Sequence, residues 1–557
     1  MKRKEKIFER LKKLYGNQAG YAWKKIEEEL SDYEPSEKKA TKLTQEDTIL
    51  ITYGDTIISP GKKGLEVLKD FLEKYVGDAV SNVHLLPMYP FTSDDGFSVT
   101  DYREINPDLG TWKDVKLLSE KYGLMFDAVI NHISRSSRWF KKYLEGEAPY
   151  TEYFITCDPD EDYSRVTRPR ALPLLTKVET AEGKRHVWTT FSTDQIDLNF
   201  ACPEVMAEIL NILVGYARAG ARFIRLDAIG FLWKKKGTTC MHLPETHEAV
   251  KLMKDILKIY EPDTRIITET NVPHEDKISY LGHGSDEADL VYQFPLPPLT
   301  MFSILKGNAR VLSEWMKTLT LPGKETAFFN FLSSHDGIGV RPTEGILTAE
   351  ERQFLVDQTL KNGGEVSYKD NGDGTRSPYE LNINYQDALA SPEESDEQRI
   401  DKFLAAETIL LSMQGIPGIY IHSLLGSRND YYGKTVSGIP RRINREKLDY
   451  GFLSEQLEQN TNRSRIFWEL IRRLKIRKEE EAFSPGAGQR VLDLDERVLA
   501  LERTGEEAGA RIYALINVSG ETITLEDERL IGKDLLTGAS CEKKVQLPPY
   551  GTAWIKE

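Results

Sequence analysis

Two carboxylates, Asp227 and Glu269, each follow directly on a short apolar run, Arg-Phe-Ile-Arg-Leu before the first and Ile-Ile-Thr before the second. Arg225 stands two residues before Asp227, so an extended strand would project both side chains to the same side. If that side is the interior of a barrel, the arginine would keep the aspartate ionised, as a covalent nucleophile requires. A buried ion pair with a purely structural role explains this spacing equally well.

Glu269 has apolar neighbours, and burial among them would raise the pKa of its carboxyl group. A carboxyl that is still protonated near neutral pH can donate a proton to a leaving glycosidic oxygen. Two carboxyl groups on adjacent strands can lie about 5 Å apart, the separation found in retaining glycosidases. Glu269 would be unremarkable alone, but together with Asp227 it indicates glycoside cleavage through a covalent intermediate.

Two further apolar runs end in polar residues that could bind sugar hydroxyls. Asn131 and His132 end one run, and His335 and Asp336 end another. A single buried histidine is more often a structural residue than a ligand-binding one. Four run ends of this kind in one chain favour a sugar site.

These side chains need a scaffold that gathers the ends of many strands. Beyond residue 47, short apolar runs alternate with helical segments, and buried parallel strands have this composition. The expected strands are Thr48–Ile57, Ala79–Met88, Leu124–His132, Arg222–Ile229, Thr264–Asn271, Asp289–Leu296, Ala327–Asp336 and Gly415–Ser423. Eight such units predict an α/β fold, a (β/α)₈ TIM barrel with catalytic groups at the C-terminal strand ends. A doubly wound open sheet is the alternative.

Two connections are too long for simple loops and predict insertions after the third and seventh strands. The end of the chain alternates polar and apolar residues, which favours a small antiparallel β-domain. The predicted organisation is an N-terminal helical extension and linker (1–47), a barrel in three parts (48–133, 206–337 and 401–482), an inserted domain (134–205), a lid (338–400) and a C-terminal β-domain (483–557).

Composition limits the function classes. The net charge of −14 argues against nucleic-acid and anionic-membrane partners, since both need basic patches. The four cysteines lie far apart and no pair has metal-ligand spacing, and the calcium-like loop at Asp370 has Gly372 at a ligand position. No metal site is expected. The charged N-terminus does not resemble a signal peptide and no run of about 20 apolar residues occurs, so a cytoplasmic location is expected.

The segments ARFIRLDAIG, IITET, SSHDGIG and AVINHIS resemble the four signature regions of glycoside hydrolase family 13, the α-amylase family. The resemblance covers nearly the whole chain beyond residue 48. It implies a (β/α)₈ barrel, a domain B after the third strand and a C-terminal β-sandwich. It also implies a nucleophile, an acid/base and a transition-state stabiliser, which are Asp227, Glu269 and Asp336, and supporting glucose-site residues, which are Arg225, His132 and His335.

Within this family, HLLPMYPFTSDDGFSVTDY is similar to the second-strand segment of the sucrose phosphorylase subgroup, which implies that Asp94 holds the glucosyl ring and Phe97 stacks on it. Phe231 matches an aromatic position of that subgroup. Arg441 lies near an arginine that meets phosphate in these enzymes. The pair Tyr379-Glu380 departs from the Tyr-Gln of the sucrose enzymes in a loop that lines the acceptor site, which puts sucrose in doubt.

VYQFPLPPL, PYELNINYQDAL and the N-terminal extension look more like the glucosylglycerate phosphorylases. This likeness implies phosphorolysis of 2-O-α-glucosyl-glycerate to α-glucose 1-phosphate and glycerate, with phosphate as a substrate and no cofactor. Arg441 is the candidate cation for phosphate or glycerate. The alternatives are sucrose, sucrose 6′-phosphate or glucosylglycerol as the substrate, an α-glucosidase, and a non-catalytic barrel in a transporter complex. The three carboxylates disfavour the last.

Overall fold

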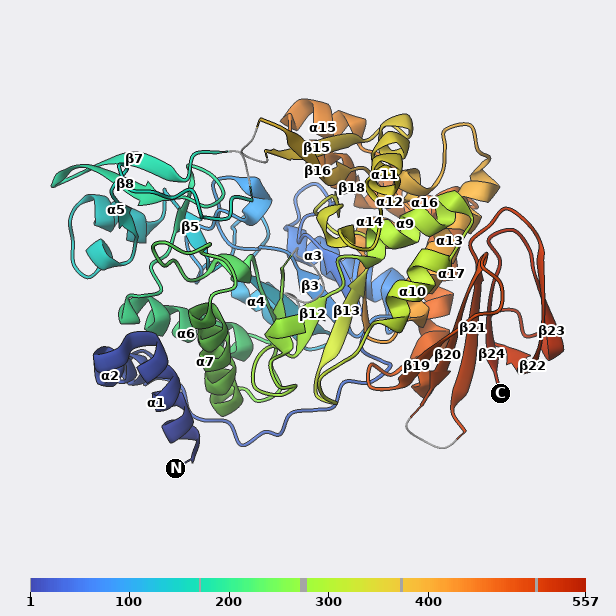
Figure 1. Ribbon diagram of the computed structural model, residues 1–557, viewed down its shortest axis with the longest axis horizontal. Coiled ribbons are helices and arrows are strands. Elements are labelled where there is room, and N and C mark those ends of the chain that lie inside the picture. The colour runs from blue at the N-terminus through green and yellow to red at the C-terminus, as the bar shows by residue number, and fades with distance from the viewer. Residues whose placement is uncertain (1, 170–171, 271–277, 371–373, 506–508) are drawn as a thin grey trace.

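Eight parallel strands close into a barrel at the centre of the molecule, in the order β1-β17-β13-β12-β11-β10-β4-β3 (Figure 1). The computed structural model describes residues 2–169, 172–270, 278–370, 374–505 and 509–557. The barrel strands are β1 (Ile49–Thr52), β3 (Asn82–Leu85), β4 (Gly123–Ala128), β10 (Ala221–Leu226), β11 (Arg265–Thr268), β12 (Leu290–Tyr292), β13 (Ala327–Phe331) and β17 (Ile416–Tyr420). All eight expected strands are confirmed and the open sheet is excluded. Asn271 and Gly372, named above, lie outside the described residues.

The barrel strands are almost entirely apolar because their side chains are buried on both faces. His84 of β3, Asp127 of β4 and Arg225 of β10 are charged residues inside these strands, and Asp127 contacts both of the others. Arg225 pairs with Asp127 in the β4–β10 register, and all three are at most 2% exposed. These polar side chains form one layer beneath the C-terminal end of the barrel.

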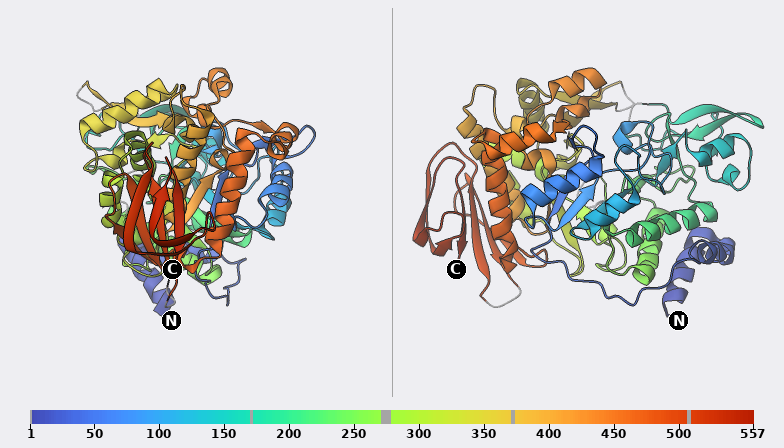
Figure 2. Two further views of the ribbon diagram at one scale, coloured as in Figure 1. Left: turned by 90° about the vertical axis from the view of Figure 1, so that its right-hand side faces the viewer. Right: turned by 180° about the vertical axis from the view of Figure 1, so that it is seen from behind.

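The connecting helices surround the barrel (Figures 1 and 2). They include α3 (Gly64–Phe71), α4 (Trp112–Ser119), α6 (Pro203–Arg218), α7 (Pro244–Tyr260), α9 (Leu296–Lys306), α10 (Arg310–Lys317), α13 (Asp396–Ser412) and α17 (Asn462–Lys478). Proline at the first position starts α6 and α7, and capping boxes at Ser395 and Thr461 start α13 and α17. The described residues include no helix long and apolar enough to span a membrane.

Both long connections fold as small sheets above the C-terminal end of the barrel (Figure 1). Between β4 and β10, β5 (His132–Ser134) pairs with β9 (Gln195–Asp197), and β6 (Thr156–Cys157), β8 (Gly183–Trp188) and β7 (Leu175–Thr180) form a second sheet beside α5 (Arg138–Leu144). Between β13 and β17, β14 (Ile338–Gly339), β16 (Arg376–Asn382) and β15 (Glu365–Asp370) form a sheet beside α11 (Ala349–Lys361). The short helices α12 (Tyr385–Leu389), α14 (Ile421–Leu424), α15 (Tyr431–Ser437) and α16 (Tyr450–Glu458) complete this side of the molecule.

The N-terminal residues form two helices, α1 (Lys2–Tyr15) and α2 (Ala19–Glu29), as expected from their apolar spacing. They pack against α7 and α6 respectively. Arg10 is buried in this interface, where its Nε lies 2.5 Å from Asp255 and its Nη1 lies 3.1 Å from Glu248. Residues 31–47 then run along the surface without regular structure toward β1.

The C-terminal strands form one antiparallel sheet in the order β19-β20-β21-β24-β22-β23. They are β19 (Gly488–Leu492), β20 (Val498–Thr504), β21 (Arg511–Asn517), β22 (Ile523–Asp534), β23 (Ser540–Leu547) and β24 (Thr552–Lys556). One face packs on the barrel helices, and β22 and β23 fold over the other to enclose a second core. The implied β-sandwich is therefore a single folded sheet.

Arg477, at the end of α17, is completely buried among backbone carbonyls of three segments. Its guanidinium donates to the carbonyl of Gln45 at 2.7 Å, to that of Leu411 at 3.0 Å and to that of Phe483 at 3.0 Å. These carbonyls belong to the N-terminal linker, to α13 and to the connection that leads into the C-terminal sheet. Arg477 thus joins both ends of the chain to the barrel.

Candidate active site

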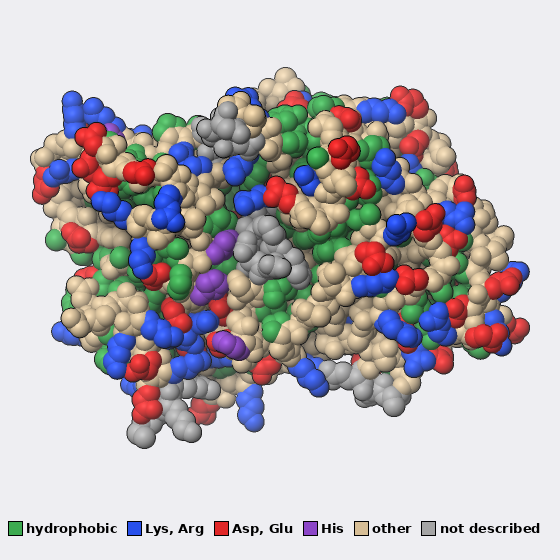
Figure 3. Space-filling model, in the orientation of Figure 1, with side chains coloured by type: hydrophobic (Ala, Val, Ile, Leu, Met, Phe, Trp, Pro, Cys, Tyr) green, Lys and Arg blue, Asp and Glu red, His purple; other side chains and the backbone are tan. Residues whose placement is uncertain are grey.

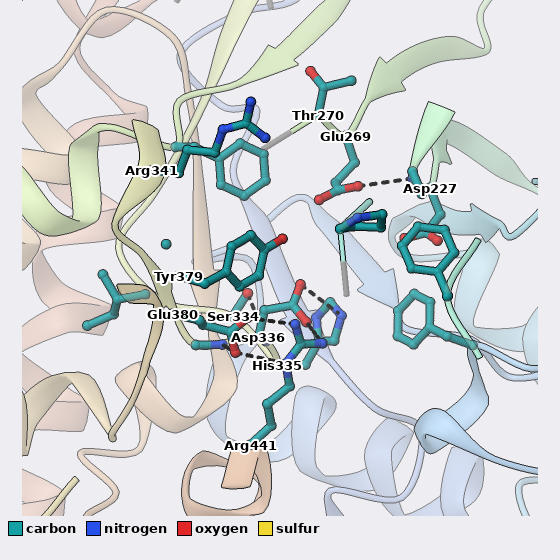
Figure 4. A pocket seen from close by; sticks show the side chains of 18 of the residues that line it. Asp227, Glu269, Thr270, Ser334, His335, Asp336, Arg341, Tyr379, Glu380 and Arg441 are labelled. Atoms are coloured by element: carbon teal, nitrogen blue, oxygen red, sulfur yellow. Dashed lines mark hydrogen bonds and ion pairs between the residues drawn. The ribbon is translucent and has the colours of Figure 1, made fainter. Parts of the chain in front are cut away.

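A pocket opens at the C-terminal end of the barrel, between the two inserted sheets, and gathers the predicted site residues (Figure 4). On the face of the molecule in Figure 3, acidic and basic side chains are interspersed, with no extended basic patch. Arg225 lies just beneath the pocket floor. The lining of the pocket includes Asp94, Phe97, His132, Asp227, Phe231, Glu269, His335, Asp336, Tyr379, Glu380 and Arg441.

Asp227 and Glu269 occupy matching places, one residue beyond the ends of the adjacent strands β10 and β11. The backbone N–H of Asp227 donates to Ala128 of β4 and that of Glu269 to Leu226 of β10, at 3.2 and 3.1 Å. The parallel hydrogen-bond ladder therefore extends to both carboxylates and holds their backbones in register. Their position follows from the strand ends, as the spacing in the sequence predicts.

Arg225 lies between the two carboxylates. Its Nη1 donates to Asp227 Oδ1 at 2.8 Å, and its Nη2 is 3.9 Å from Glu269 Oε1. The same guanidinium also donates a hydrogen bond to Asp127 Oδ1. The other oxygen of Asp127, Oδ2, lies within hydrogen-bond distance of His84 Nε2, at 2.7 Å. Glu269 in addition accepts the N–H of Ala228 at 3.0 Å. One cation therefore serves three buried carboxylates.

The pKa values follow from burial and from this shared cation. Burial raises the pKa of Glu269, in the direction expected from the sequence. Burial also raises the pKa of Asp227, to about 8, although Arg225 opposes it. Arg225 thus acts on Asp227 in the predicted direction, because it favours the ionised form, but burial of the carboxyl group outweighs this effect. The pair retains a proton near neutral pH, and the shorter contact to Arg225 favours the anion on Asp227 and the proton on Glu269.

Asp336 faces this pair from the loop after β13. Arg441 Nη1 lies 2.6 Å from its Oδ1, and His335 Nε2 lies 3.4 Å from its Oδ2. Asp336 is partly buried, and Arg441 and His335 lower its pKa well below the usual range. The structure thus places one strongly ionised carboxylate opposite two whose pKa values are raised.

Aromatic and amide groups form the pocket wall on the side of the insertion between β4 and β10. Phe97 stacks on His335 with ring centres 4.9 Å apart and planes 6° from parallel. His132 Nε2 is 2.8 Å from the carbonyl of Phe97, and Gln195 Nε2 donates to Asp94 Oδ2 at 3.2 Å. Phe231 lies near Phe191, a residue of the insertion that also lines the pocket. A flat apolar wall beside amide and carboxylate groups is a suitable surface for a sugar ring.

The opposite wall is a clamp of ion pairs that we call the acceptor-side clamp, formed by Arg441, Glu380 and Asp336. Arg441 donates from Nε to Glu380 Oε1 at 2.8 Å and from Nη2 to Glu380 Oε2 at 2.6 Å. Glu380 Oε1 also accepts the N–H of Gly337 at 3.0 Å. Tyr379 stands next to the clamp, and burial raises the pKa of its hydroxyl to about 12. Both carboxylates balance the charge of Arg441.

Several residues of the site escaped the sequence analysis. His84 and Asp127 could have been found, because each is a lone charged residue in an apolar strand. Gln195 and Phe191 lie in the insertion, where no periodic pattern identifies them. Three cations also line the pocket and were not expected there; they are Arg168, Arg341 and Lys369.

Comparison with known proteins agrees with this geometry. The family model for the alpha amylase catalytic domain matches residues 71–341. A glucosylglycerate phosphorylase of Allomeiothermus silvanus is 46% identical over 99% of this chain and 98% of its own. A glucosylglycerate phosphorylase of Escherichia coli strain K12 is 44% identical over 92% of each chain. The crystal structure of a sucrose 6F-phosphate phosphorylase from Thermoanaerobacter thermosaccharolyticum superimposes with a TM-score of 0.75 and 26% identity, covering 90% of this chain and 98% of that one.

The full-length similarity extends through both insertions and the C-terminal sheet. The eight-stranded barrel, the two carboxylates at the ends of β10 and β11 and the matched catalytic-domain model agree with one another. The resemblance found in the sequence is thereby confirmed. The chain belongs to the α-amylase family, glycoside hydrolase family 13, in the branch that contains the glucosylglycerate phosphorylases.

Proposed function

We propose that the protein is a retaining glycoside phosphorylase that converts 2-O-α-glucosyl-glycerate and phosphate to α-glucose 1-phosphate and glycerate. The observation that carries the proposal is the single guanidinium of Arg225 between Asp227 and Glu269. It gives two neighbouring carboxyl groups different protonation states, which double displacement requires. The similarity over the whole chain to glucosylglycerate phosphorylases supports the substrate.

In the first half-reaction, Glu269 donates its proton to the glycosidic oxygen while Asp227 attacks the anomeric carbon. The carbon–oxygen bond to glycerate breaks, a bond to Asp227 forms, and glycerate leaves with the proton. In the second, a phosphate oxygen attacks the anomeric carbon and displaces Asp227. Glu269 takes up the proton that phosphate loses, which restores both carboxyl groups and gives α-glucose 1-phosphate.

The remaining side chains divide between the glucosyl ring and the group that leaves or attacks. Asp336 would stabilise the positive charge that develops on the ring, because its own negative charge persists at low pH. Residues that would hold or contact the ring are Asp94, Phe97, His132, Arg225, Phe231 and His335, and those on the acceptor side are Tyr379, Glu380 and Arg441. The reaction as written needs no metal or cofactor, and all its substrates are small and soluble, which suits a cytoplasmic enzyme.

An acceptor panel tests the proposal. The protein is incubated with glucose 1-phosphate and either glycerate, glycerol, fructose or fructose 6-phosphate, and phosphate release is measured. Release that depends on glycerate is expected. Release with fructose alone would assign the protein to sucrose-type substrates, and glucose formation without any acceptor dependence would show a hydrolase.

A further inference from the structure

The acceptor-side clamp leaves Arg441 little capacity for a further anion. The guanidinium forms a two-point contact with Glu380 and a third contact with Asp336, so two negative charges already surround it. An oxyanion that approached Arg441 would have to displace a carboxylate and would meet the repulsion of both. The structure favours a positioning role for Arg441, in which it orients Asp336.

Arg341 has the opposite environment. It follows β14, lines the same pocket and is partly buried. Among the described residues it forms no hydrogen bond or ion pair with an acidic side chain, whereas most other arginines near the pocket do. Figure 4 shows its side chain on the Glu269 side of Tyr379, away from Arg441. Arg341 and Glu269 therefore line the same pocket and lie on the same side of Tyr379 in this view.

Two further cations line the same pocket and come from distant segments. Lys369 belongs to β15, and Arg168 belongs to the insertion between β4 and β10. The Nε of Arg168 is buried and has no hydrogen-bond partner. An unsatisfied buried donor is unfavourable until an acceptor reaches it, so the pocket suits a ligand that carries negatively charged oxygens.

We infer that Arg341 is the residue that recognises the oxyanion of the acceptor, with Arg168 and Lys369 adding positive charge. The inference rests on the proposed function and specifies how that site selects its acceptor. A planar guanidinium binds a carboxylate or a phosphate through two parallel hydrogen bonds, which a neutral hydroxymethyl group cannot form. Arg341 thus determines the preference for an anionic acceptor over a neutral one of the same size.

Glycerate and glycerol differ only in whether the first carbon is a carboxylate or a hydroxymethyl group, so they form a matched pair of acceptors. With α-glucosyl fluoride as donor, fluoride release at varied acceptor concentration gives kcat/KM for each acceptor. Arg341→Ala is expected to lower the ratio of glycerate to glycerol about ten- to a hundredfold. The ratio of phosphate to glycerol should fall in the same way. Arg341→Lys, which keeps the charge but not the fork, should give intermediate ratios.

Arg376→Ala is the matched control, since Arg376 is an exposed arginine of β16 that does not line the pocket. Its ratios should equal those of the wild type. Equal losses for glycerate, phosphate and glycerol in Arg341→Ala, or unchanged ratios, would overturn the inference. The wild-type panel is a separate outcome: if wild type uses phosphate but not glycerate, the proposed substrate fails, and the phosphate-to-glycerol ratio still decides the role of Arg341.

Discussion

Arg225 connects the protonation of the whole catalytic centre, because Asp127, Asp227 and Glu269 all share its charge. Removing any one of these acids changes the pKa values of the other two. Substitutions within the group should therefore be strongly non-additive, as for residues that act as a unit.

Asp227→Asn should abolish turnover, with kcat reduced on the order of 10⁴-fold or more for every donor, since no covalent intermediate can form. Rates with α-glucosyl fluoride and with glucose 1-phosphate test this directly. Asp401→Asn, a change of the same kind on α13 outside the pocket, is the control. Substantial activity in Asp227→Asn would refute the role of nucleophile.

Glu269→Gln should slow cleavage of each donor to a different extent, according to how much its leaving group needs a proton. Cleavage of glucosylglycerate should fall by about 10²- to 10⁴-fold, the usual contribution of a general acid. Fluoride leaves without protonation, so kcat/KM for α-glucosyl fluoride should change far less. Comparison of the two donors in one variant is the measurement, and equal losses would contradict the assignment of Glu269 as proton donor.

The raised pKa of Glu269 has a consequence for the pH profile. The proton donor works only in its protonated form, so a raised pKa keeps the enzyme active toward neutral pH. Activity on glucosylglycerate should then decline as pH rises through that pKa. The profile of kcat/KM for α-glucosyl fluoride should lack this alkaline limb, and an identical limb for both donors would assign the titration to another group.

The sequence could predict those catalytic residues that follow directly on a strand. Asp227 and Glu269 come one residue after β10 and β11, where chain order and spatial position agree. The partners of Arg441 could not be predicted, because Glu380 reaches it from β16 and Asp336 from the loop after β13, and no periodicity brings these segments together. The pKa of Asp227 was also beyond prediction, since it depends first on how deeply the carboxyl group is buried and then on charges from other strands.

At the scale of elements, the segment between β13 and β14 packs very closely against β16 of the inserted sheet. Gly337 lies so near Glu380 that an added Cβ would stand 2.6 Å from the Glu380 Cγ and 2.6 Å from the carbonyl of Leu381. Only glycine permits this contact. The acceptor-side clamp therefore depends on one missing side chain.

Gly337→Ala should displace Glu380 and loosen its grip on Arg441, which raises KM for the acceptor by about tenfold or more while donor binding changes less. Steady-state kinetics with varied glycerate measure the effect. Gly488→Ala on β19 is the control, because a Cβ there meets only ordinary contacts at 3.6 Å. An unchanged acceptor KM would show that the clamp does not shape the acceptor site.

Strands could be predicted from the sequence where their residues are mostly apolar, and could not where charged residues predominate. Barrel strands and β20, β21 and β24 are apolar enough to identify, and all were expected. β23 reads Ser-Cys-Glu-Lys-Lys-Val-Gln-Leu and is largely exposed, so its charged residues conceal a strand that pairs with β22. The folded shape of the C-terminal sheet arises from that hairpin and was not evident beforehand.

At the scale of the whole molecule, the N-terminal helices are attached to the barrel through buried ion pairs. Arg10→Ala would leave Asp255 without its closest partner and Glu248 without a buried one, and should lower Tm by roughly 2–4 °C. Catalytic constants at moderate temperature should not change, since α1 packs against α7 and none of its residues lines the pocket. Lys4→Ala removes an exposed pair with Glu27 and serves as the control in the same thermal melts. Equal Tm values for both variants would contradict the prediction.

The buried hydrogen bonds of Arg477 affect how the protein unfolds. Three of its carbonyl partners lie in the N-terminal linker, in α13 and in the connection to the C-terminal sheet, so none of these segments can separate without leaving buried donors unpaired. The cost falls on all of them together, which couples their unfolding. Boundaries that are plain along the sequence are therefore not expected to mark independent units of stability: the N-terminal linker, α13 and the start of the C-terminal domain should unfold together.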